Sequence, residues 1–261
     1  MSAVQTLGTL YLVPAPLDFG CDDMTPLTDV LPEGTLRQVA RITHWVSENA
    51  KSCRAYLKRV DALYPLATPL QQQHIAELPR EVHKKGDHGG ATHARFDAKG
   101  LLAPLAQGLD MGLVSEAGMP AVADPGSSVV RAAHDLGARV APLVGPVSLL
   151  LALAASGLNG QSFAFVGYLP QDADARARRI AQLEALALKS GQTQLFIETP
   201  YRNAALWQAL LQQLQPATRL ARASGLTLAA QQVACRSVRD WRASHAAPPE
   251  KQSPTVFALG A

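Results

Sequence analysis

The sequence predicts an α/β protein of two domains, the first built on a mostly parallel sheet and the second on a mixed sheet. Between Met111 and Ser156 the order strand, glycine-rich turn, helix occurs twice in succession, which is typical of parallel βαβ units. Beyond residue 160, later strands follow one another without helices between them, which indicates antiparallel members. With 261 residues, 48% of them hydrophobic, the chain can bury two modest cores.

The first domain is expected over residues 1–157, and its first strand is the apolar run Thr9–Val13, which Pro14 ends. Residues 71–97 have no clear period, and within them 83–90 are interpreted as a mobile loop. The other predicted elements of this domain are helices over 35–43, 50–59, 127–136 and 145–156, and strands over 45–47, 111–115 and 139–143.

The second domain is expected over residues 158–261, after the turn-forming segment 157–160. Its predicted elements are strands over 162–166, 194–197, 219–223, 231–235 and 255–259, with helices over 173–189 and 203–214. The late strands follow without intervening helices, so the sequence predicts a mixed sheet here.

Composition excludes several classes. Cys21, Cys53 and Cys235 lie far apart, which argues against a disulfide scaffold or a cysteine-rich zinc site and fits a reducing compartment. The most apolar stretch, 140–158, contains prolines and glycines and does not have the pattern of a membrane span. The net charge of +3 is too small to indicate nucleic-acid binding by itself. We therefore expect a soluble, cytoplasmic protein with no membrane partner.

Loops rich in glycine and proline follow several predicted strands, at 14–17, 116–126, 144–148 and 199–202. Ligands of α/β sheets bind outside the carboxyl ends of the strands, where glycine permits close approach of the backbone and proline fixes the loop. Such loops suit a flat heterocycle with a ribose, although glycine and proline can also simply mark turns. No GxxxxGK[ST] or early GxGxxG motif occurs, which favours a phosphate-free adenosine ligand, S-adenosylmethionine, over NAD or ATP.

The segment 114–126, Val-Ser-Glu-Ala-Gly-Met-Pro-Ala-Val-Ala-Asp-Pro-Gly, resembles the signature loop of the tetrapyrrole methylase superfamily. The resemblance is closest to its small-subunit rRNA cytidine 2′-O-ribose methyltransferase branch, of which the chain looks like a shorter, divergent member. It implies two α/β domains with S-adenosylmethionine in the cleft between them, and a homodimer. Further matching segments occur in order at 10–14, 143–146, 156–158, 165–170, 198–202 and 221–227.

The same resemblance implies which residues contact the cofactor, and Tyr201 is added because its ring can stack on adenine. The expected cofactor-binding residues are Pro14, Ser115, Ala117, Gly118, Met119, Val122, Val147, Ser148, Glu198, Tyr201, Leu226, Pro254 and Thr255.

The chain departs from the rRNA branch in the segments associated with substrate. Where that branch has an acidic residue followed by Asp-Thr-Arg, this chain has Glu48-Asn-Ala-Lys51. Its Gly-Asn pair is replaced by Leu17-Asp18-Phe19, and its His-Glu-rich segment by residues 70–78. The resemblance therefore supports methyl transfer more strongly than ribose methylation of rRNA.

Several side chains have two interpretations. Glu116 is the candidate catalytic base, or else a loop carboxylate that accepts backbone N–H groups. Asp124 is interpreted as a cap of the following helix, and Glu198 as the partner of Arg202. The expected substrate-binding residues are Lys51, Arg54, Tyr168 and Arg202, although the first two also fit a solvated helix face. His83, His88 and His93 lie in a loop without a well-placed carboxylate or cysteine, and methyl transfer does not require a metal, so no metal is expected.

The leading hypothesis is an S-adenosylmethionine-dependent methyltransferase that acts on RNA at a ribose 2′ oxygen. One alternative keeps the fold and methylates a tetrapyrrole or another small molecule. Another is a protein that binds S-adenosylmethionine without turnover. A dehydrogenase that uses NAD fits less well, because the glycine fingerprint is missing.

Overall fold

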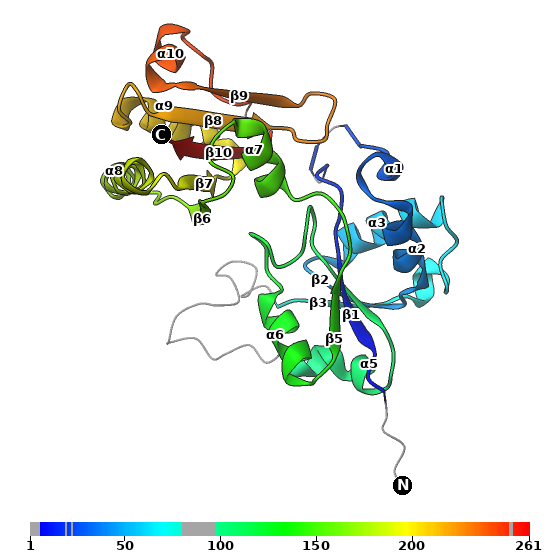
Figure 1. The fold of residues 1–261 in the computed structure, drawn as a ribbon. Coiled ribbons are helices and arrows are strands. Elements are labelled where there is room, and N and C mark those ends of the chain that lie inside the picture. Colours follow the sequence, from blue (N-terminus) through cyan, green and yellow to red (C-terminus); the bar gives the residue numbers. More distant parts are fainter. Residues whose placement is uncertain (1–5, 19, 22, 80–97, 251–252) are drawn as a thin grey trace. The chain divides into compact units, whose positions relative to one another are not determined.

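The computed structural model describes residues 6–18, 20–21, 23–79, 98–250 and 253–261. The chain forms two compact units (Figure 1). The first unit comprises Met1–Phe19 and Thr25–Val147, and the second comprises Gly20–Met24 and Ser148–Ala261.

The first unit contains a five-stranded sheet in the order β3-β2-β4-β1-β5, and every pairing in it is parallel. Because all strands run the same way, their carboxyl ends lie at one edge of the sheet. The register pairs Val114 with both Val13 and Ser47, so β1, β4 and β2 end level with one another. The strands are β1 (Thr9–Val13), β2 (His44–Ser47), β3 (His74–Glu77), β4 (Met111–Val114) and β5 (Arg139–Pro142).

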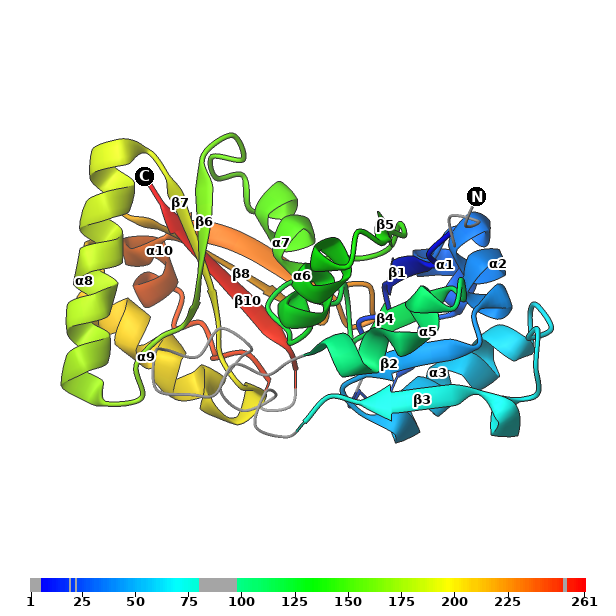
Figure 2. The ribbon, with the colours of Figure 1, turned by 90° about the horizontal axis from the view of Figure 1, so that it is seen from below.

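Helices cover both faces of this sheet (Figures 1 and 2). Helices α1 (Leu27–Val30), α2 (Glu33–Arg41) and α3 (Ala50–Asp61) share one core with Trp45 of β2. Helix α3 buries residues 53, 56, 57 and 60, the spacing of one helical face, and the Asn49 side chain caps its first turn. On the other face, η2 (Ala98–Leu102), α5 (Ala103–Ala106) and α6 (Ser127–Asp135) surround a second core. The short 3-10 turn η1 (Leu70–Gln72) precedes β3.

The second unit contains a mixed sheet in the order β6-β7-β10-β8-β9. Strands β6 and β7 are parallel, whereas β10 runs antiparallel to β7 and β8, and β8 antiparallel to β9. The strands are β6 (Phe163–Tyr168), β7 (Thr193–Ile197), β8 (Arg219–Ser224), β9 (Gln232–Ser237) and β10 (Thr255–Gly260).

Two layers of helix enclose the second sheet. Helices α8 (Ala173–Ser190), α9 (Asn203–Gln213) and α10 (Val238–Ala243) form a core with Phe196 and Phe257, in which Trp207 and Trp241 meet edge to face. Helix α7 (Ser148–Ser156) lies on the opposite face (Figure 2), packed against β8, β9 and β10. The 3-10 turn η3 (Pro200–Arg202) leads into α9.

The predicted fold class is confirmed, since the first sheet is parallel and the second is mixed. Strand β3 lies in the segment 71–97, for which no strand was predicted, because β3 is too short for its alternation to stand out. Residues 80–97 lie outside the described part of the chain. Helix α7 packs on the second sheet, whereas the sequence-based boundary after Gly157 placed it in the first domain. Within the described residues, no helix has the length and apolar composition that crossing a bilayer requires.

Candidate functional site

The order of the first sheet marks a position where ligands of α/β proteins bind. The connection from β1 leads to β2 on one side of the sheet, whereas the connection from β4 passes β1 to reach β5 on the other side. The connections that leave the neighbouring parallel strands β1 and β4 therefore lead to opposite sides of the sheet. Ligands bind at the carboxyl ends of the strands at such a switch point. Pro14 follows β1 and Ser115 follows β4, so two predicted cofactor-binding residues lie at this switch point.

The loops after β1 and β4 are joined by their main chains. The Ala15 N–H donates to the Gly118 carbonyl at 2.9 Å, and the Gly118 N–H donates to the Ala15 carbonyl at 3.0 Å. Gly118 has a φ of +74°, a conformation that glycine adopts without strain. The main chain of Gly118 thus fixes the two loops against each other.

Beyond Gly118, the same loop contains two alanines in the left-handed region, Ala121 with φ +64° and Ala123 with φ +63°. Non-glycine residues there are strained, and such residues cluster at ligand-binding and switch regions. The loop is held by the Ala121 N–H, which donates to the Pro125 carbonyl at 3.3 Å, and by the Val122 N–H, which donates to the Met119 carbonyl at 3.3 Å. The Val122 side chain between the two alanines is exposed.

The loop after β5 approaches Pro14 closely. A Cβ on Gly145 would lie 2.3 Å from Cγ and 2.5 Å from Cβ of the Pro14 ring, and 2.9 Å from Leu31 Cδ2. The Thr35 hydroxyl donates to the Val144 carbonyl at 2.8 Å and ties this loop to α2. Only glycine fits at 145. The main chain of the loop after β5, which also carries Val147, therefore packs directly against the Pro14 ring.

Gly145→Ala is expected to destabilise the first unit by about 1–3 kcal/mol, because the added methyl group forces Pro14 and its loop to move. Urea denaturation of the two proteins measures the difference. Gly34→Ala is the matched control, since a Cβ at this exposed helical position meets nothing within 4 Å. Equal losses of stability in the two variants would contradict the packing argument.

Three carboxyl groups gather at this edge of the sheet. Glu48 follows β2, Glu116 follows β4, and Asp124 lies farther along the β4–α6 loop. Burial, followed by the charges of Glu48 and Glu116, raises the pKa of Asp124 to about 8. The Ser52 hydroxyl of α3 donates to Glu116 Oε1 at 3.3 Å. At neutral pH this cluster therefore retains a proton on Asp124.

Asp124 is not the helix cap that the sequence suggested. The N-cap residue of α6 is Gly126, two positions beyond Asp124, and it has no side chain that could cap the helix. The alternative interpretation of Glu116 was a loop carboxylate that accepts from backbone N–H groups. The hydrogen bond found for it comes from the Ser52 hydroxyl. Sequence reasoning missed Glu48 as a member of this cluster; its position directly after a strand is the signal that could have identified it.

Two serine hydroxyls are buried at the same strand ends. Ser47 ends β2 and is 1% exposed, and Ser115 follows β4 and is 6% exposed. Among the described residues, neither hydroxyl has a hydrogen-bond partner. Buried hydroxyls without partners are rare in folded proteins and need an explanation, such as a bound ligand.

Asp124→Asn is expected to remove a pH dependence of stability. The folded protein holds a proton on Asp124 up to about pH 8, whereas the unfolded chain releases it above its ordinary pKa of 3.8. From about pH 5 to about pH 8 the wild type should therefore lose stability relative to the variant, by up to about 1.4 kcal/mol per pH unit. Urea denaturation across this range measures the slope. Asp135→Asn, at an exposed position of α6, is the control; parallel curves for wild type and Asp124→Asn would refute the assignment.

The second unit gathers its predicted site residues at one edge of its own sheet. Ile197, at the end of β7, pairs with both Tyr168 and Val256, and Thr255 pairs with Ser224. The ends of β6, β7 and β8 and the start of β10 therefore lie together. The predicted residues found at this edge are Tyr168, Glu198, Tyr201, Arg202, Leu226, Pro254 and Thr255.

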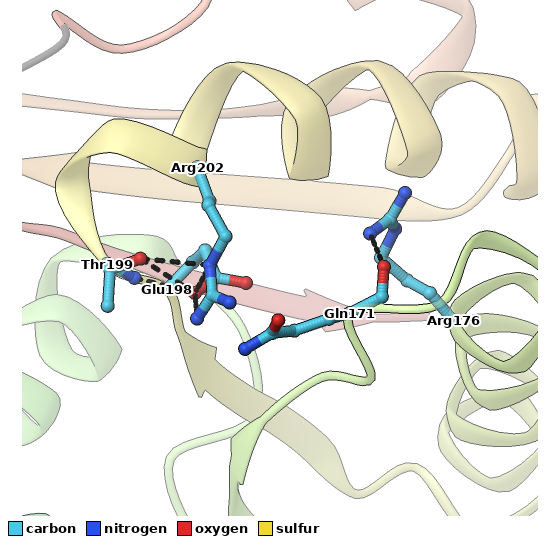
Figure 3. A network of polar contacts seen from close by, with 5 residues as sticks. All are labelled: Gln171, Arg176, Glu198, Thr199 and Arg202. Carbon is cyan, nitrogen blue, oxygen red and sulfur yellow. Dashed lines mark hydrogen bonds and ion pairs between the residues drawn. The ribbon is translucent and has the colours of Figure 1, made fainter.

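Glu198 is the centre of a polar network at this edge (Figure 3). Its Oε1 accepts from Arg202 Nε at 2.9 Å, lies 2.7 Å from Arg202 Nη2, and accepts from the Thr199 N–H at 2.7 Å. The Arg202 guanidinium also lies 5.4 Å from the ring centre of Tyr201, whose side chain is exposed. The predicted pairing of Glu198 with Arg202 is confirmed. Beside it in Figure 3, Arg176 donates to the Gln171 carbonyl at 3.0 Å.

The turns after β8 and before β10 are bonded to each other. The Gly225 N–H donates to the Pro254 carbonyl at 3.1 Å, and the hydroxyls of Ser224 and Thr255 are 2.8 Å apart. Asn203 Nδ2 donates to the Ser253 carbonyl at 3.1 Å, and Asn203 Oδ1 is buried without a partner in the described structure. Sequence reasoning missed Asn203, because nothing local distinguishes the first residue of a helix from one that faces a site.

Helix α3 carries four basic side chains, of which one is held in an ion pair. Lys51, Arg54 and Lys58 are exposed, whereas Arg59 is paired with Asp18 at 3.0 Å. His83, His88 and His93 lie outside the described residues. Among the residues that the structure does describe, no group of three or more metal-binding side chains occurs.

With this geometry established, the chain was compared with known proteins. The model of the Tetrapyrrole (Corrin/Porphyrin) Methylases family matches residues 36–240, so the chain belongs to this family. It is 32% identical to "Ribosomal RNA small subunit methyltransferase I" of Pseudomonas aeruginosa, covering 76% of this chain and 59% of that protein. The protein of the same name from Bacillus subtilis is 32% identical over 75% of this chain and 56% of its own length. The chain thus spans somewhat under three fifths of the curated relatives it matches.

Solved structures share the fold at low sequence identity. Uroporphyrin-III-C-methyltransferase from Thermus thermophilus matches with a TM-score of 0.52 and 20% identity, covering 97% of this chain and 94% of that one. Diphthine synthase matches with a TM-score of 0.59 and 13% identity, covering 97% and 90%. Both have the fold of this chain.

Proposed function

We propose that this protein is a methyltransferase that uses S-adenosylmethionine. The observation that carries the proposal is the strained loop 114–126 at the switch point of the first sheet, with its carboxyl cluster, in a chain of the tetrapyrrole methylase family. The residues fit such a cofactor, because Ser115 has a buried hydroxyl that lacks a partner among the described residues.

The cofactor would be held by residues of both units. From the first unit we assign Pro14, Ser115, Ala117, Gly118, Met119, Val122 and Val147. From the second unit we assign Ser148, Glu198, Tyr201, Leu226, Pro254 and Thr255. When bound, S-adenosylmethionine supplies an electrophilic methyl group.

We propose a ribose hydroxyl of RNA as the methyl acceptor. The name shared by the curated relatives, a methyltransferase of small-subunit ribosomal RNA, supports this choice. A hydroxyl is a weak nucleophile and benefits from a proton acceptor. Glu116 is assigned that role: its carboxylate lies at the switch point of the first sheet, and the Ser52 hydroxyl donates to it and orients it. Lys51, Arg54, Tyr168 and Arg202 are assigned to the substrate.

We further propose a homodimer located in the cytoplasm. Exposed apolar side chains on α7 and β6 support self-association, since single soluble domains rarely leave such groups uncovered. These side chains are Leu150, Leu151, Phe163 and Phe165. Light scattering coupled to gel filtration measures the mass of the particle; a monomer at micromolar concentration would count against the dimer.

The proposed activity is tested with methyl-labelled S-adenosylmethionine and RNA from cells that lack this protein. Label in ribosomal RNA, recovered after nuclease digestion as a 2′-O-methylated nucleoside, is the expected result. Label in a small-molecule extract and none in RNA would favour the tetrapyrrole or other small-molecule alternative. Calorimetric binding of S-adenosylmethionine with no transfer to either fraction would favour the non-catalytic alternative.

A further inference from the structure

The positive charge of the second unit is concentrated in one stretch of sequence. Residues 219–242 contain five arginines and a single acidic residue, Asp240, which gives a net charge of +4. The whole chain has a net charge of +3, so everything outside this stretch is close to neutral. The stretch forms β8, β9 and α10. Such a local excess of arginine is the electrostatic footprint expected of a polyanion-binding surface.

Two of these arginines, Arg222 and Arg236, lie within cation–π distance of tryptophan rings. In the β8–β9 hairpin, Arg222 pairs with Ala234 and Leu220 pairs with Arg236, so Arg222 and Arg236 are diagonal neighbours on one face. The Arg236 guanidinium lies 4.8 Å from the centre of the Trp241 ring. Arg222 lies 5.0 Å from the Trp207 ring and 5.1 Å from Trp241. These are cation–π distances, and they hold two like charges close together.

The Trp241 ring is itself fixed, because its Nε1–H donates to the Leu220 carbonyl at 2.7 Å. A guanidinium held flat on a fixed ring keeps the N–H groups at its edge directed outward, in the fork that matches two phosphate oxygens. Arg236 is exposed, whereas Arg222 is half buried behind it. Burial, and after it the neighbouring positive charge of Arg236, lowers the pKa of Arg222.

Acidic side chains do little to neutralise this group. Among the described residues, Asp240 forms a long 3.9 Å pair with Arg239, whose side chain is 78% exposed, and Asp240 mainly accepts from Ser237. Arg242 donates two hydrogen bonds, to the carbonyls of Leu211 and Leu214, and caps the end of α9. Arg222 donates to the Ala247 carbonyl and Arg219 to the Cys235 carbonyl, contacts that leave their charges without an acidic partner. The arginines left with unneutralised charge are Arg219, Arg222, Arg236 and Arg239, here called the β8–α10 arginine cluster.

The surroundings of the cluster distinguish between classes of partner. Within the described residues 203–261, no large apolar side chain is exposed. Protein interfaces centre on buried apolar or aromatic anchors, and membrane-binding surfaces insert apolar side chains, so neither class fits. A phosphate backbone needs only positive charge and hydrogen-bond donors.

We infer that the β8–α10 arginine cluster is a docking surface for the phosphate backbone of RNA. This inference deepens the proposed function, on which it rests, by assigning a second RNA contact in addition to Lys51 and Arg54. Contacts of this kind position a nucleic acid without reading its sequence. They would retain the RNA while its acceptor nucleotide is placed at the site.

The test uses the full chain and a fluorescein-labelled single-stranded RNA of about 20 nucleotides, titrated from about 50 mM to about 200 mM salt. The double variant R236Q/R239Q is expected to bind about ten-fold more weakly at the low-salt end, and its slope of log affinity against log salt is expected to be smaller by about 1.4, which is two phosphate contacts. The control R178Q/K189Q removes two exposed charges from α8 and is expected to bind like wild type.

The variant R236K/R239K distinguishes a loss of positive charge from a loss of folding. It keeps both charges and is therefore expected to keep the wild-type salt slope. An unchanged slope in R236Q/R239Q, or an equal loss in R178Q/K189Q, would overturn the inference. The inference would also be overturned if phosphatidylserine vesicles or polyglutamate competed as strongly as unlabelled RNA.

If wild type binds RNA through the cluster but transfers no methyl group to it, the proposed function fails while the docking surface stands. If wild type methylates RNA and R236Q/R239Q does so with an unchanged KM, the docking surface fails alone.

Discussion

Glu116→Gln is expected to slow methyl transfer to RNA by about 10²–10⁴-fold, the usual contribution of a positioned general base. Gln keeps the size of the side chain and can still contact the Ser52 hydroxyl, but it cannot take a proton from a ribose hydroxyl. Because the change keeps the main chain of loop 114–126 and the size of the side chain, the affinity for S-adenosylmethionine should stay nearly constant. Single-turnover transfer rates and calorimetry measure the two quantities separately.

Two further variants make this result specific. Glu116→Asp keeps a carboxylate and should restore part of the lost rate, whereas Glu33→Gln, at an exposed position of α2 in the same unit, should change nothing. Ser52→Ala removes the hydroxyl that orients Glu116 and should give a smaller loss than Glu116→Gln. A Glu116→Gln protein that transfers methyl groups at the wild-type rate would show that the proton acceptor lies elsewhere.

Arg202→Ala is expected to destabilise the second unit by about 3 kcal/mol, because it leaves the carboxylate of Glu198 buried without its cation. The Glu198 side chain is 3% exposed and that of Arg202 is 25% exposed, so the loss should lie at the lower end of the range for buried pairs. Arg202→Ala with Glu198→Gln removes the buried charge as well and should recover much of the stability. The cycle of both single variants and the double variant gives the coupling between the two side chains.

The unfolding of the two units has to be followed separately, since a chain of two units need not unfold in one step. Of the three tryptophans, Trp45 lies in the first unit, and Trp207 and Trp241 lie in the core of the second. In a Trp45→Phe background, fluorescence therefore reports the second unit alone. No change in its urea midpoint on Arg202→Ala would mean that the Glu198 carboxylate is adequately compensated by Thr199.

Local sequence was a good guide to the elements that bound the site. Thr9–Val13 ends at Pro14, and the run over 111–115 ends in the Gly-Pro loop, so the strand ends and the loops after them could be read directly. The predicted Glu198–Arg202 pair also formed, since the two residues lie four positions apart and the turn η3 brings them together. Elements with few residues, such as β3, α1 and α10, were missed because four to six residues carry too little periodic signal.

The sequence by itself determined the α/β class, the order of the main strands and helices, and the loop that marks the family. These properties are encoded over short stretches, in the period of apolar residues and in the glycines and prolines that interrupt them. Only the tertiary structure decided which distant segments meet. Glu48 joins Glu116 and Asp124 because β2 pairs with β4, and Arg222 and Arg236 share the Trp241 ring because β8 pairs with β9 above α10. Helix α7 is apolar on every side, so its sequence predicts burial but not the sheet that buries it. Periodicity specifies a buried face, whereas strand pairing, which depends on the whole chain, specifies the partner of that face.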